Sequence, residues 1–340
     1  AGTTQPAATQ QEFKSALQKA VVKGLKEQAG ELTAKLLEET APLEIVQNEI
    51  IPALDTVGKG YEAKTVYLPQ SEAMYKFRAQ GKKLAIEEMP ALDCVQVLFG
   101  VRHCDTKAIQ CLDKVFLDDT FTDPQYKDKR DKTIVFALAC NNPKATCFCE
   151  SMGIDRAHAE QSVADVQVYD LGERYGFEAV SDKGQACLNA LNGMTDGEAK
   201  LPEQKPQSIA FDAAGLPEKL SHMFEDPIWD EYAFKCLNCG TCSYICPTCH
   251  CFDINNKMRG TTGLKLRTWD SCMFGEYTQM AGGHNPRPSK KERVRNRFLH
   301  KLQYFNEKHD MSLCVGCGRC IAKCPVNMDI TKFIRQVIAE

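Results

Sequence analysis

The sequence has little excess charge and no long apolar run. Its formal net charge of -3 over 340 residues gives no general attraction to nucleic acid or to an anionic membrane surface, so we expect neither partner. No stretch reaches the roughly 18 apolar residues that a membrane-spanning helix needs, which predicts no membrane insertion. The first residues, AGTTQPAATQ, lack the basic region and apolar run of a secretory signal. We therefore expect a cytoplasmic protein.

Cysteine, in contrast, is abundant, with 18 residues in the chain. Disulfide frameworks are typical of short secreted chains that cannot build a core, whereas 43% of this chain is hydrophobic. Many of the cysteines are also crowded at two-residue intervals, which favours metal binding over disulfide pairing. We therefore interpret them chiefly as reduced thiolates that bind metal.

Two copies of the pattern C-x2-C-x2-C-x3-C-P occur, CLNCGTCSYICP and CVGCGRCIAKCP. In such phrases the first three thiolates hold one [4Fe-4S] cluster and the fourth ligates the other cluster. We therefore predict two [4Fe-4S] clusters with crossed ligands. The first would be held by Cys236, Cys239, Cys242 and Cys324, and the second by Cys314, Cys317, Cys320 and Cys246. A pair of structural zinc sites is the alternative, which the third cysteine and the terminal CP of each phrase disfavour.

The pattern along the chain predicts an α+β multidomain protein. Apolar residues at three- and four-residue steps predict an N-terminal helical segment, assigned to residues 1–65. Over residues 66–230, short β-rich runs alternate with helical patterns, which predicts an α/β domain with a mostly parallel sheet. Residues 231–340 are predicted to form a ferredoxin-like dicluster module with a long insertion at 248–313.

Four β-rich runs define the predicted sheet, CVQVLFGV, KTIVFALAC, DVQVYDL and GFEAV. Cys104 follows the first run, and the second run is followed by Cys140, Cys147 and Cys149. Because the carboxyl ends of neighbouring parallel strands converge on one crevice, we predict that these thiolates hold a third iron–sulfur cluster. Four inert buried thiols are the alternative.

Several phrases resemble the β subunit of cytoplasmic sulfhydrogenases and the related iron–sulfur subunit of anaerobic sulfite reductases. They are CPTCHCFDINN, LRTWDSCMFGEYTQMAGGHNPRPSKKERVRNRFLHK, CVGCGRCIAKCPVNMDI, YLPQSEAMYKFR, LFGVRHCDTKAI and ALACNNPKATCFCESMG. The resemblance covers residues 66–340 and implies an iron–sulfur electron-transfer subunit. It also implies a flavin-containing, NAD(P)H-handling partner and a hydrogenase-like or other terminal redox partner. His103 departs from the family, which usually has proline there.

The insertion contains cysteines at Cys249, Cys251 and Cys272, which resemble family positions. We interpret Cys272 as a buried thiol, and the sequence favours no role for the other two. The basic run RPSKKERVRNR, residues 287–297, is interpreted as a solvated helix face, with docking of an acidic partner as the alternative.

The segment from Leu17 to Gln70 resembles a second family, the helical cap that precedes the cobalamin-binding domain of methionine synthases. The resemblance implies a cap over one face of a corrinoid. However, the helical pattern breaks at LPQSEAM, short of the cap's last helix, and no D-x-H-x-x-G phrase follows to supply the histidine beneath cobalt. We therefore expect a helical docking arm, and corrinoid binding is doubtful.

These patterns favour an iron–sulfur protein that relays electrons between a flavin/NAD(P)H-handling partner and a hydrogenase-like or other redox subunit. The cysteine phrases supply no nucleophile or acid–base pair, so a substrate site of its own is not evident. A corrinoid-linked methyl-transfer or reductive-activation component is one alternative. A flavin-binding catalytic subunit is another, although no G-x-G-x-x-G follows a strand.

Overall fold

The computed structural model describes residues 63–339, except 160–161, 173, 192–193, 196 and 199, and also the single residue Lys35. The predicted N-terminal helices therefore lie outside the described residues, apart from Lys35, which is helical. Residues 62–185 and 199–340 form one compact unit, which contains both predicted cysteine phrases.

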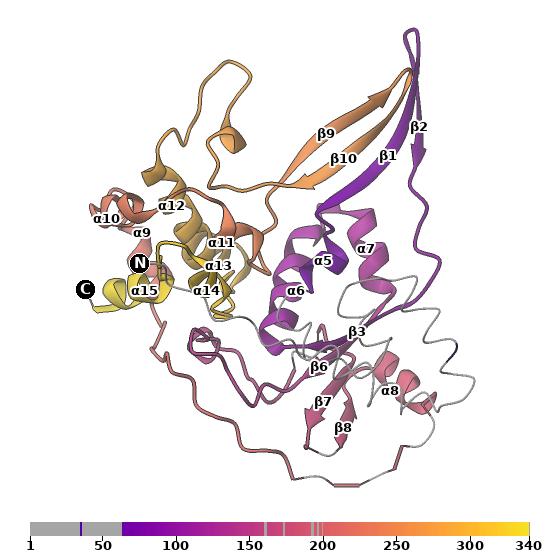
Figure 1. The fold of residues 1–340 in the computed structure, drawn as a ribbon, viewed down its shortest axis with the longest axis vertical. Coiled ribbons are helices and arrows are strands. Elements are labelled where there is room, and N and C mark those ends of the chain that lie inside the picture. Colours follow the sequence, from indigo (N-terminus) through magenta and orange to yellow (C-terminus); the bar gives the residue numbers. More distant parts are fainter. Residues whose placement is uncertain are drawn as a thin grey trace, which may run out of the picture. The chain divides into compact units, whose positions relative to one another are not determined.

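This unit contains both helices and strands (Figure 1). The strands are β1 Ser71–Gln80, β2 Lys83–Glu88, β3 Gln96–Val101, β4 Leu117–Asp118, β5 Phe121–Thr122, β6 Thr133–Leu138, β7 Val166–Asp170, β8 Tyr175–Ala179, β9 Phe252–Arg259 and β10 Thr262–Trp269. The helices are α5 Lys64–Tyr67, α6 His103–Phe116, α7 Pro124–Asp131, η2 Glu150–Met152, α8 Asp182–Asn189, α9 Leu216–Ser221, α10 Ile228–Lys235, α11 Thr241–Tyr244, η3 Glu276–Thr278, α12 Lys290–Leu299, η4 His300–Tyr304, α13 Phe305–His309, α14 Arg319–Lys323 and α15 Ile330–Ala339.

The predicted α/β sheet is confirmed, with strand order β3-β6-β7-β8. β3 pairs with β6 and β6 with β7 in parallel, while the β7–β8 pair is antiparallel. The central strand β6, TIVFAL, is almost entirely buried, as expected for a parallel strand covered on both faces. Ile109 and Leu112 of α6 pack in one core cluster with Val101 and Val135, so the helix covers one face of the sheet.

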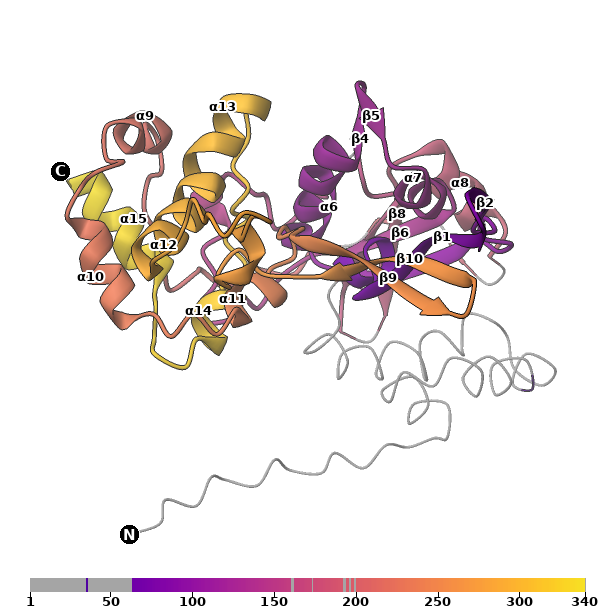
Figure 2. The same cartoon turned by 90° about the horizontal axis from the view of Figure 1, so that it is seen from above.

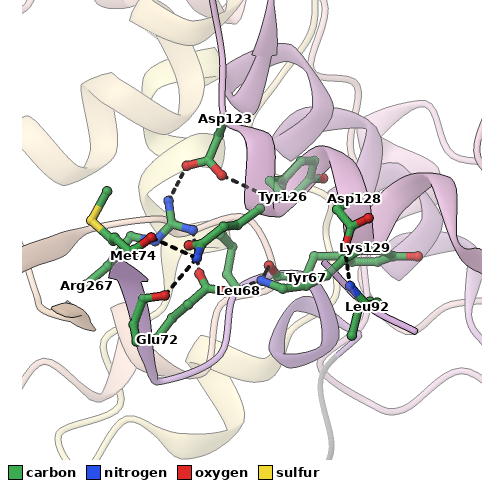
Figure 3. Close-up of polar contacts among 12 residues, drawn as sticks. Tyr67, Leu68, Glu72, Met74, Leu92, Asp123, Tyr126, Asp128, Lys129 and Arg267 are labelled. Atoms are coloured by element: carbon green, nitrogen blue, oxygen red, sulfur yellow. Dashed lines mark hydrogen bonds and ion pairs between the residues drawn. The ribbon is translucent and has the colours of Figure 1, made fainter. Parts of the chain in front are cut away.

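A second sheet, with order β2-β1-β10-β9, joins the start of this unit to the predicted insertion. β10 pairs antiparallel with both β1 and β9, so the hairpin of the insertion is anchored on residues almost 200 positions away (Figure 1). Buried Arg267 of β10 fixes this arrangement, since it donates to Glu72 of β1 at 2.5 Å and to Asp123 at 2.5 Å (Figure 3). Asp123 also caps α7 by accepting from the Tyr126 N–H. The insertion is therefore integrated with the region that the sequence assigned to the α/β domain.

Helices α9, α10, α12 and α15 pack around a second core (Figure 2). Trp229 of α10 lies 5.0 Å from Phe333 of α15, and Phe298 of α12 lies 4.8 Å from Phe333, measured between ring centroids. α12 continues directly into η4, a π-helical turn, and then α13. π-turns often occur at functional sites, and the side chains of η4 include the buried cation Lys301.

Candidate metal centres

The first predicted quartet lines one cavity of about 610 Å³ of empty space, part of it open to solvent. Its walls include Cys236, Cys239, Cys242 and Cys324. Three of these thiols come from the first phrase and one comes from the end of the second. The structure therefore brings together the four residues that the crossed pattern predicts for the first cluster.

Helix ends position these four thiols. α10 ends immediately before Cys236, and α14 ends immediately before Cys324. Gly240 turns the chain into α11 with φ +71°, a conformation that favours glycine. Backbone N–H groups already point at two of the sulfurs: Asn238 donates to Cys236 Sγ at 3.3 Å, and Met328 donates to Cys324 Sγ at 3.2 Å. Such N–H to sulfur bonds are the usual support of cluster ligands.

The second quartet lines a separate cavity of about 320 Å³ of empty space. Cys246, Cys314, Cys317 and Cys320 are all in its wall. Cys246 and Cys314 are buried, whereas Cys239 of the first cavity is exposed. The two sites therefore differ in their access to solvent, and Cys320 borders both.

A buried ammonium group contacts the second quartet. Lys301, only 3% exposed, donates to Cys246 Sγ at 3.1 Å and to Thr248 Oγ1 at 2.8 Å. Burial alone would lower the pKa of Lys301, but its electrostatic interaction with Cys246 and Cys249 raises that pKa above its ordinary value. The pKa of Cys246 is lowered, chiefly by a hydrogen bond with Cys249 and also by the charge of Lys301. Lys301 belongs to the π-turn η4, and no sequence pattern linked it to a cysteine.

A second cation, Arg297, lies between the two quartets. Its guanidinium donates to Cys242 O at 2.9 Å and to Cys249 Sγ at 3.4 Å, and the residue is 5% exposed. Arg293 is also buried. The prediction of a solvated face for residues 287–297 is therefore wrong for these two arginines, because they occupy the α12 face that packs against the cysteine-bearing core.

The predicted third group gathers beyond the carboxyl ends of β3 and β6. Cys149 lies close enough to Cys147 and Cys140 for their charges to act on it, and it accepts a hydrogen bond from Gln207 Nε2 at 2.9 Å. Cys104 interacts electrostatically with Cys149 and Cys317. Burial raises the pKa of Cys104 and Cys149. The four thiols thus share one region of the fold, as the strand pattern predicts.

The loop that carries the third group rests directly on the second phrase. Phe148 N–H donates to Gly316 O at 2.8 Å, and a Cβ on Gly316 would lie 2.5 Å from Cys149 Cα. A Cβ on Gly318 would collide with the Thr146 carbonyl. Because these glycines have no side chain, the backbone of the second phrase can pack directly on the backbone of residues 146–149. The Cys147–Cys149 loop therefore lies against the second quartet.

Replacing Gly318 with alanine is expected to destabilise the protein by about 2 to 5 kcal/mol. Its positive φ of +69° costs an alanine about 1 to 2 kcal/mol, and the collision with Thr146 adds about 1 to 3 kcal/mol. Urea unfolding checks this value. Gly260→Ala is the matched control, because Gly260 has φ +62° and nothing within 4 Å, so only the smaller cost applies. Equal effects in the two variants would contradict the close contact.

The donor atoms of the two quartets are cysteine sulfurs that line cavities. In the part of the chain that the structure describes, no three Cys, His, Asp or Glu side chains are placed to hold one metal ion. The thiols instead surround cavities, as a cubane with one ligand per iron requires. Among the same residues, no helix is long and apolar enough to cross a membrane.

Comparison with known proteins agrees with these features. The 4Fe-4S dicluster domain family matches residues 235–328, and the B12 binding domain family matches residues 14–73. The chain is 31% identical to sulfhydrogenase 2 subunit beta of Pyrococcus furiosus over 285 residues, which are 81% of this chain and 82% of that protein. No solved structure matches the chain. The predicted iron–sulfur module and both family resemblances are thereby confirmed.

Proposed function

The chain belongs to the family of sulfhydrogenase β subunits, and from that premise we propose that it relays single electrons through two [4Fe-4S] clusters inside an oxidoreductase complex. It is an iron–sulfur electron-transfer protein. Beyond this role, we propose which cysteines are the cluster ligands, how many clusters the chain holds and which subunits it contacts. When bound, each cluster would accept and return one electron.

One observation carries the ligand assignment. The wall of each cavity includes three cysteines of one phrase and the fourth cysteine of the other, and Cys320 of the second phrase also borders the first cavity. Two sites that each held their own four cysteines would not need this exchange. We assign Cys236, Cys239, Cys242 and Cys324 to the first cluster and Cys314, Cys317, Cys320 and Cys246 to the second.

The surrounding residues give the two sites different tasks. Met273, Val294 and Phe298 form an apolar wall of the first cavity and keep water from that side. Exposed Cys239 puts this site within reach of a partner's cofactor. At the second site, Lys301 places a positive charge on a ligand sulfur within a buried environment. The first site therefore suits exchange with a partner, and the second suits relay inside the protein.

A third cluster at Cys104, Cys140, Cys147 and Cys149 is part of the proposal, supported by their common region beside the second quartet. Replacing Cys140 with serine is then expected to remove about four of about twelve iron atoms per chain. Iron and acid-labile sulfide analysis of anaerobically purified protein measures the loss. If the parent protein holds about eight iron atoms per chain and Cys140→Ser holds the same number, these four residues are inert thiols.

The proposed partners are a flavin-containing subunit that handles NAD(P)H and a hydrogenase-like or other terminal redox subunit. The support is the family, since the relative from Pyrococcus furiosus is named as a subunit of a sulfhydrogenase. Anaerobic isolation of the native complex, followed by flavin and nickel analysis and identification of its subunits, tests this. Recovery of the chain alone, under gentle conditions and from several preparations, would count against it.

A corrinoid-linked role is a second candidate, supported by the B12 binding domain match over residues 14–73. The missing D-x-H-x-x-G phrase weighs against a histidine beneath cobalt. Cobalt analysis after incubation of the full chain with hydroxocobalamin separates the two roles. Retention of stoichiometric cobalt through gel filtration would support a corrinoid function, and its absence would favour a docking arm.

A further inference from the structure

Three cysteines of the insertion remain outside all the proposed cluster sites, and two of them face each other. Cys251 directly precedes β9, and Cys272 lies three residues beyond the end of β10. The last pair in the register of this hairpin is Phe252 with Trp269, and Asp270 N–H donates to Cys251 O at 3.0 Å. The open end of the hairpin therefore holds the two cysteines side by side, close enough for each side chain to act on the pKa of the other.

Several groups act on the pKa of Cys251. Besides the Cys272 side chain, the Cys272 backbone N–H and the Tyr277 hydroxyl lower it. The buried Arg297 guanidinium lies close enough for its charge to act on both thiols. These contacts lower the pKa of Cys251 to about 6, with the Cys272 hydrogen bond as the main cause, while the pKa of Cys272 is raised. Such a setting stabilises a thiolate at Cys251 and a thiol at Cys272.

The two sulfurs also differ in access. Cys251 is partly exposed, whereas Cys272 is only 8% exposed and belongs to the core that contains Trp229 and Met273. An accessible thiolate backed by a buried thiol is the arrangement of an attacking and a resolving cysteine. Two inert core cysteines would need neither this difference in exposure nor the buried arginine nearby.

We propose that Cys251 and Cys272 are a thiol–disulfide exchange site for small-molecule disulfides. The Cys251 thiolate attacks one sulfur of the disulfide and forms a mixed disulfide with it as the S–S bond breaks, and the first small thiolate leaves and takes a proton from solvent. The Cys272 sulfur then attacks Cys251 Sγ to form the Cys251–Cys272 bond, and its proton passes to the second small thiolate as that thiolate leaves. The products are two small thiols and a Cys251–Cys272 disulfide, which a dithiol reductant returns to the starting state with two electrons and two protons.

Oxidised glutathione is the probe, and the full chain purified without oxygen is the sample. After acid quenching, alkylation and digestion, mass spectrometry is expected to find the Cys251 peptide linked to the Cys272 peptide, and dithiothreitol to reverse the link. Cys272→Ser should trap glutathione on Cys251, and Cys251→Ser should reduce the linkage to background. Cys249→Ser is the matched control, because it removes a neighbouring thiol and should leave the link intact.

Two results would overturn the proposal. One is the absence of a Cys251–Cys272 link in the parent protein while other cysteines take up glutathione. The other is loss of about four iron atoms per chain in Cys251→Ser, which would make this residue a cluster ligand. The linkage is read from peptide masses and the clusters from iron content, so a failure of the electron-relay proposal is seen separately from a failure of this one.

Discussion

Replacing Cys324 with serine should remove about four iron atoms, and the lost cluster should be the one that Cys236, Cys239 and Cys242 hold. The reason is that the two phrases exchange their fourth cysteines between the two cavities. Cys324 belongs to the second phrase, but it lines the cavity of the first. The cluster held by Cys314, Cys317 and Cys320 should survive, because its fourth ligand is Cys246.

Electron paramagnetic resonance of the dithionite-reduced protein makes the assignment. Neighbouring reduced clusters couple magnetically, so the variant should lose the signal of the first site and its coupling to the second, while the signal of the second site remains. Cys246→Ser should give the complementary result, with the signal of the second site lost and that of the more exposed first site kept. Cys94→Ser is the control, since Cys94 is exposed and outside both cavities. Loss of the second cluster in Cys324→Ser, with the first intact, would mean that each phrase completes its own site.

Much of this arrangement follows from local sequence. The runs that become β3, β6, β7 and β8 are rich in β-branched and aromatic residues, so their existence and their mostly parallel pairing could be predicted. That the first three cysteines of one phrase share a cavity with the fourth cysteine of the other could also be predicted, because phrase spacing restricts which thiols reach one cubane. Both signals are contained within windows of about a dozen residues.

The rest depends on contacts between distant residues. β1 pairs with β10 across almost 200 positions, and neither strand shows which partner it will take. Arg297 lies in a run with the composition of a solvated helix, yet its guanidinium is buried among cysteines. Lys301 follows it in a turn whose π-helical geometry no residue pattern reveals. Charges that influence a metal centre from a neighbouring helix leave no spacing rule in the sequence.

Lys301 should have the largest effect on the second cluster among the residues that are not its ligands. Its ammonium is buried and donates to Cys246 Sγ at 3.1 Å, and Thr248 Oγ1 holds it in place at 2.8 Å. Reduction adds one negative charge to a cluster that its thiolates already make negative. A cation in contact with a ligand sulfur therefore stabilises the reduced form more than the oxidised form.

Replacing Lys301 with methionine is expected to lower the reduction potential of the second cluster by roughly 60 to 130 mV. A hydrogen bond to a charged group contributes about 1.5 to 3 kcal/mol, and about 59 mV corresponds to a tenfold change for one electron. Methionine fills a similar volume without the cost of desolvating an ammonium, so the protein should still fold. A redox titration followed by electron paramagnetic resonance measures the potential of each cluster.

Two matched variants separate contact from charge. Lys308→Met removes the same charge from exposed α13, where solvent screens it, and should leave both potentials nearly unchanged. Lys301→Arg retains the charge and should keep the reduction potential of the second cluster close to that of the parent protein. Because Cys246 is a ligand of the second site only, the first cluster should shift less than the second in Lys301→Met. Equal shifts of both clusters would show that Lys301 acts through the general field of the protein, and that its bond to Cys246 has no special effect.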